Sequence, residues 1–140
     1  MTHLPDFETQ EMQWMHDTTF LLTKIRIMQK VEHWLGFCAE KMQPYLQAMA
    51  TRLPEGCAVK ARKIIKGEKY LELPYMVLDL PQFTQGARWL LMRTMFRWGG
   101  EFSCSLLLQD LPAVHRVTPA LWQTWQGQDV FLTTARDPWA

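Results

Sequence analysis

The sequence predicts an α+β domain, in which one long N-terminal helix packs on one antiparallel sheet of about four to five strands. Three observations lead to this prediction. Apolar residues recur at helical spacing between residues 19 and 50, and apolar and polar residues alternate between residues 102 and 109. A Gly-Gly pair precedes the alternating run, as in a hairpin. The chain has 140 residues, so we expect a single domain spanning residues 1–140.

The helical stripe lies on one side of the segment 19–50, and charged residues fall mostly outside it. Pro44 interrupts the segment; because proline lacks the N–H group and clashes with the preceding turn, we expect a kink or break near Met42. The conformation of residues 1–18 stays open. The stripe residues are Leu21, Ile25, Met28, Leu35, Cys38, Met42, Leu46 and Met49.

The rest of the chain reads as strands and one short helix. We expect strands at residues 59–65, 73–80, 87–98, 102–109 and 130–134. Thr118 and Pro119 provide a cap and a first-turn proline for a short helix that ends near Gly127.

The hairpin register follows from the pattern of apolar residues. A three-residue loop at residues 99–101 places Trp98 opposite Phe102 and Phe96 opposite Cys104, which makes one face almost wholly apolar. We expect that face to pack under the long helix. The other face would expose an apolar patch of the residue types found in protein interfaces: Trp89, Leu91, Met95 and Leu107.

Composition narrows the possible functions. The formal net charge is +1, so bulk charge does not indicate nucleic acid, and the basic segment 60–70 reads better as a protected strand edge. No apolar run approaches the ~18 residues of a membrane helix. The three cysteines form no CxxC motif and the four histidines have no metal-ligand spacing. We therefore expect a soluble cytoplasmic protein without a metal or cofactor.

A second set of residues could bind a ligand. Asp79 and Arg93 interrupt apolar strands, where an ion pair would satisfy both charges. Arg93 and Arg97 share a strand face and could hold a carboxylate or phosphate. The candidate ligand-binding residues are Glu68, Tyr70, Tyr75, Asp79, Arg93 and Arg97.

Part of the sequence resembles a family of small uncharacterised bacterial proteins. The resemblance is carried by the segments Lys66–Tyr70, Leu73–Pro81 and Arg93–Gly99. The resemblance covers roughly residues 20–110. It implies a single cytoplasmic domain and carries no activity or site residues. The pattern of that family has an aromatic residue where Arg97 stands here.

These observations favour a non-enzymatic interaction or assembly protein that forms a homodimer. The alternative is a small enzyme or ligand-binding domain that uses Glu68, Tyr70, Asp79 and Arg93 on an anionic small molecule. No nucleophile–base pair is legible in the sequence, so the interaction protein is the preferred hypothesis.

Overall fold

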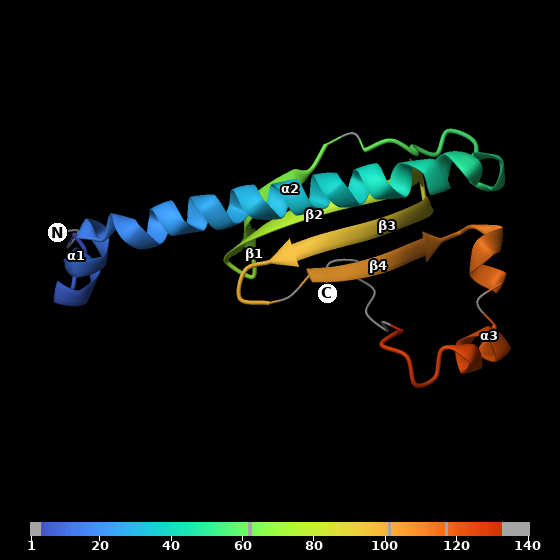
Figure 1. Cartoon of the computed structure of the whole chain (residues 1–140). Coiled ribbons are helices and arrows are strands. Elements are labelled where there is room, and N and C mark those ends of the chain that lie inside the picture. The colour runs from blue at the N-terminus through green and yellow to red at the C-terminus, as the bar shows by residue number, and fades with distance from the viewer. Residues whose placement is uncertain (1–3, 62, 101, 117, 133–140) are drawn as a thin grey trace.

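The computed structural model describes residues 4–61, 63–100, 102–116 and 118–132, and it confirms the α+β fold (Figure 1). Two helices come first, α1 (Thr9–His16) and α2 (Thr18–Ala48), followed by the short 3-10 turn η1 (Ala50–Arg52). Four strands then follow in order. They are β1 (Ile65–Tyr70), β2 (Leu73–Gln85), β3 (Arg88–Arg97) and β4 (Phe102–Gln109). A second 3-10 turn, η2 (Pro112–Arg116), leads to the short helix α3 (Pro119–Thr124), which Thr118 caps as expected.

Helix α2 runs through Pro44 without a break, so of the two outcomes predicted near Met42, a kink or a break, the break is wrong. Pro44 is exposed, and its position on the solvent side lets water replace the backbone donor that proline lacks. The break comes earlier, at Asp17. This residue ends α1 and caps α2, with its Oδ1 accepting a 2.9 Å hydrogen bond from the backbone N–H of Thr19.

The four strands form one antiparallel sheet in the order β1-β2-β3-β4. The expected strand 59–65 is wrong, because regular pairing begins only at Ile65 and Ala58 makes an isolated bridge to Gln82. Of the expected strand 130–134, residues 130–132 are not in a strand, and residues 133–134 lie outside the described residues.

The β3–β4 register differs by two residues from the prediction. Phe96 lies opposite Phe102, and Thr94 lies opposite Cys104. Trp98 lies beyond the last β3–β4 pair, and its backbone N–H donates to the carbonyl of Pro74 at 2.9 Å. A shift of two residues keeps every side chain on its predicted face, since side chains alternate with period two.

The hydrophobic core joins α2 to β2. Val31, Leu35 and Leu46 of the helix pack against the even-numbered apolar residues of β2, which are Met76, Leu78 and Leu80. The predicted stripe is confirmed in its middle, where Met28, Cys38 and Met42 border this core. At its ends the prediction is wrong, because Leu21, Ile25 and Met49 are exposed.

Candidate functional site: the two faces of the sheet

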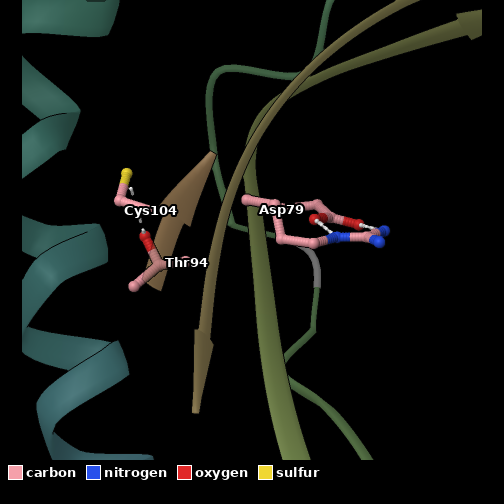
Figure 2. A network of polar contacts seen from close by, with 4 residues as sticks. Asp79, Thr94 and Cys104 are labelled. Atoms are coloured by element: carbon pink, nitrogen blue, oxygen red, sulfur yellow. Dashed lines mark hydrogen bonds and ion pairs between the residues drawn. The ribbon is translucent and has the colours of Figure 1, made fainter. Parts of the chain in front are cut away.

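The sheet separates two sets of candidate residues. We call the face toward α2 the helix face and the opposite one the outer face. Figure 2 shows Thr94 and Cys104 on the side of the helix and Asp79 on the other side of the strands. The register agrees, because Asp79 pairs with Arg93 while Leu78 pairs with Thr94.

On the outer face, Asp79 and Arg93 form the expected ion pair. The guanidinium donates twice, from Nε to Oδ1 at 2.8 Å and from Nη2 to Oδ2 at 2.9 Å. The two side chains are only 7% and 10% exposed. A bidentate pair with this little solvent satisfies both charges and locks the register of β2 against β3.

The other ligand-binding candidates also contact one another or the body of the protein. The rings of Tyr70 and Tyr75 meet edge to face with centroids 6.1 Å apart, and the Arg97 guanidinium lies 5.6 Å from the Tyr70 ring centroid. Glu68 accepts a 2.7 Å hydrogen bond from Lys24 of α2. Each of these groups therefore has a structural partner within the chain.

The residues predicted to form an exposed interface on the outer face are buried or half-buried, so that prediction is wrong. Leu91 and Met95 are buried, and Trp89 and Leu107 are half-buried. Trp89 also donates its indole N–H to the carbonyl of Gly86 at 3.0 Å. The expected open apolar patch is not on this face, because its central residues are already covered.

Gly67 of β1 allows Tyr75 to lie across it. A Cβ atom at Gly67 would stand 2.3 Å from Cε1 of Tyr75. We expect Gly67→Ala to displace the tyrosine ring and to lower the free energy of unfolding by about 1–3 kcal/mol, as overpacking does. Urea denaturation followed by tryptophan fluorescence measures the loss. The control is Gly36→Ala in α2, where the new Cβ meets nothing within 4 Å and alanine should stabilise the helix by up to ~1 kcal/mol. Equal stability of the Gly67→Ala variant and the parent would contradict the close approach.

The open apolar surface lies on the helix face instead. Residues of α2 bury β2, while Phe102 and Leu106 of β4 remain 52% and 64% exposed. A second stripe on α2 is exposed as well, formed by Phe20, Ile27 and Trp34 at seven-residue intervals. We call these five residues the helix-face patch.

A chain of ring contacts makes the patch continuous from helix to sheet. Phe20 meets Trp98 at 6.2 Å between centroids, Trp98 meets Phe96 at 6.4 Å, and Phe96 meets Phe102 at 5.2 Å. The α2 stripe therefore points toward β3 and β4.

The opposite side of α2 faces β1, where ion pairs hold it. Lys24 bonds to Glu68 at 2.7 Å, and Lys66 bonds to Glu32 at 2.6 Å. These pairs anchor the helix over the β1–β2 half of the sheet. The β3–β4 half is left without a covering helix among the described residues.

Next to the patch, α2 carries a shallow hollow of about 460 Å³, lined by Lys30, His33, Trp34 and Phe37. The Trp34 and Phe37 rings meet edge to face at 6.3 Å, and Lys41 Nζ lies 5.2 Å from the Phe37 ring centroid. The hollow thus has an aromatic centre between basic groups. Our sequence reading missed it, although the seven-residue spacing from Phe20 to Trp34 is visible in the sequence.

The structure also bears on two kinds of reactive group, a cysteine thiol and a metal-binding cluster. Burial raises the pKa of the Cys57 thiol above its usual value. A backbone hydrogen bond with Gln82 lowers this pKa, but its effect is smaller than that of burial. The thiol is therefore not an activated nucleophile at neutral pH. Among the residues that the structure describes, no group of three or more His, Cys, Asp or Glu side chains could hold a metal ion.

Comparison with protein-family models, with curated proteins and with solved structures finds no match for this chain. Within the described ranges, no helix combines the length and the apolar character needed to cross a bilayer.

Proposed function

We propose that this chain is a non-enzymatic interaction protein that associates with a second copy of itself through the helix face. The observation that carries the proposal is that α2 covers only part of the helix face. The helix buries the β2 core, whereas Phe102 and Leu106 of the neighbouring strand β4 are exposed beside it. A continuous exposed apolar surface of this kind is typical of a protein-binding site.

The exposed stripe of α2 is long enough to take part in a helix-mediated interface. The segment Phe20–Phe37 of α2 is about 26 Å long at 1.5 Å per residue. A specific interface buries about 800 Å² of each partner, so an interface here would need to include the exposed residues of β4 as well as this helix segment. Aromatic residues are also the types that contribute most to such interfaces.

The ligand-binding alternative has weaker support. The candidate ligand-binding residues already contact other side chains of the protein. Asp79 pairs with Arg93, Glu68 bonds to Lys24, and Tyr70 lies beside Arg97. We therefore assign them to holding the sheet and the helix together. The free cysteines fit a protein of a reducing compartment such as the cytoplasm.

Charge placed in the helix-face patch should separate the copies. We expect the parent protein to sediment at about twice its 16.5 kDa mass, and Trp34→Glu and Leu106→Glu to sediment as monomers, because each buries a carboxylate in an apolar interface. Analytical ultracentrifugation over a range of concentrations measures this. The matched control is Gln29→Glu, also exposed on α2 but on another side of the helix, which should stay dimeric. A parent protein that stays monomeric at high concentration would refute the proposal.

A further inference from the structure

We propose that helix α1 of one copy binds the α2 hollow of the second copy, so that the dimer exchanges its N-terminal arms. This inference rests on the self-association proposed above and names the segment that fills part of the helix face. Three observations lead to it: the chemistry of the hollow, the chemistry of α1, and the distance between them within one chain.

The hollow suits an apolar helix that carries carboxylates. Trp34 and Phe37 are 63% and 49% exposed and form its centre. Lys30 lines it, and Lys41 lies over the Phe37 ring. A docked segment would bury aromatic surface in the middle and meet ammonium groups at both ends. Acidic side chains are therefore preferred there over basic ones.

Helix α1 has the complementary chemistry. Residues 1–20 contain four acidic residues and no lysine or arginine. Glu11, Trp14 and Met15 are three and four residues apart, which places one carboxylate and two large apolar side chains on a single face. Trp14 and Met15 are exposed.

The arm is also unsupported in its own chain. Every residue from 4 to 22 is exposed, and Figure 1 shows α1 and the first turns of α2 extending past the end of the sheet. A helix of eight residues is marginal in water without tertiary contacts. Binding to a second copy would supply those contacts and would bury Trp14.

Helix geometry shows that the contact must join two copies. Asp17 separates α1 from α2, and from there to Lys41 the helix rises about 36 Å at 1.5 Å per residue. Glu11 is only about 9 Å along α1 from Asp17 by the same rise. Glu11 therefore cannot reach Lys41 of its own chain. It reaches that of a second copy when the two α2 helices run in opposite directions.

A charge exchange tests the pairing. We expect Lys41→Glu and Glu11→Lys each to raise the dimer dissociation constant about three- to tenfold at low salt, because each places like charges together. The double variant should recover most of the affinity. Glu11 also accepts a hydrogen bond from the Glu8 N–H at 2.8 Å, but a lost helix cap would not be repaired by a change at Lys41. The control is Glu55→Lys, the same charge change at an exposed turn residue outside the hollow.

Zero-length carbodiimide cross-linking of the parent dimer gives an independent result. We expect mass spectrometry to find Glu11 or Glu8 joined to Lys41 or Lys30, in dimers made by mixing ¹⁵N-labelled and unlabelled protein. Cross-links that join a labelled to an unlabelled peptide support the exchange. Two results would overturn this inference and leave the proposed self-association intact. One is a dimer whose dissociation constant does not change with the charge substitutions. The other is a dimer in which α1 cross-links only within its own copy. A monomeric parent protein overturns both.

Discussion

Replacing Asp79 by asparagine should lower the free energy of unfolding by about 3–5 kcal/mol, the usual penalty for removing one partner of a buried ion pair. The Arg93 guanidinium would lose the carboxylate that now accepts both hydrogen bonds, and neither side chain has enough solvent to compensate. Urea denaturation followed by circular dichroism measures the loss. Glu55→Gln removes a carboxylate from an exposed turn, and there we expect a change within about 0.5 kcal/mol.

A double-mutant cycle isolates the pair. Asp79→Leu combined with Arg93→Met should cost less than the sum of the two single changes, because apolar residues of similar volume no longer leave one charge buried alone. Strict additivity would show that the two side chains do not stabilise each other, despite their distances. The position of the pair on adjacent strands explains why its loss should also loosen the β2–β3 register.

Truncation of the helix–sheet core should be nearly as costly. Leu35 is fully buried and packs among Val31 and the apolar residues of β2. We expect Leu35→Ala to reduce the free energy of unfolding by about 2–5 kcal/mol through lost apolar burial and a residual cavity. The same chemical change at the exposed Leu22 is the control, and it should cost less than about 0.5 kcal/mol in a monomeric sample. Equal losses at the two positions would mean that α2 does not pack on β2 as described.

Much of the fold was readable from the sequence, because it depends on local periodicity. The α2 pattern, the alternating β4 and the Thr118 cap all predicted real elements. The Asp79–Arg93 pair was also readable, since two charges inside apolar strands need each other. Pro44 misled us because helix tolerance for proline depends on which side faces water, and the sequence alone does not show that side.

The candidate interface was misplaced for a different reason. Periodicity assigns side chains to faces correctly, but it does not say which strands a helix covers. Leu78 and Leu106 look equally apolar in the sequence and lie on the same face of the sheet, yet Leu78 is buried under α2 and Leu106 is exposed. That difference follows from the ion pairs of Lys24 and Glu32 with β1, which hold α2 over one half of the sheet. Long-range contacts of this kind cannot be inferred from spacing within a segment.

The order of elements along the chain has a consequence for synthesis on the ribosome. Leu35 is translated about 45 residues before Leu80, its core partner on β2. Translation adds about 5–20 residues per second, so roughly 2–9 seconds pass between the synthesis of the apolar side of α2 and that of the strand that covers it. During that interval the apolar side of α2 stays exposed on the nascent chain, where a chaperone can bind it. The strands have closer partners along the chain, because each pairs with its immediate neighbour in the sequence.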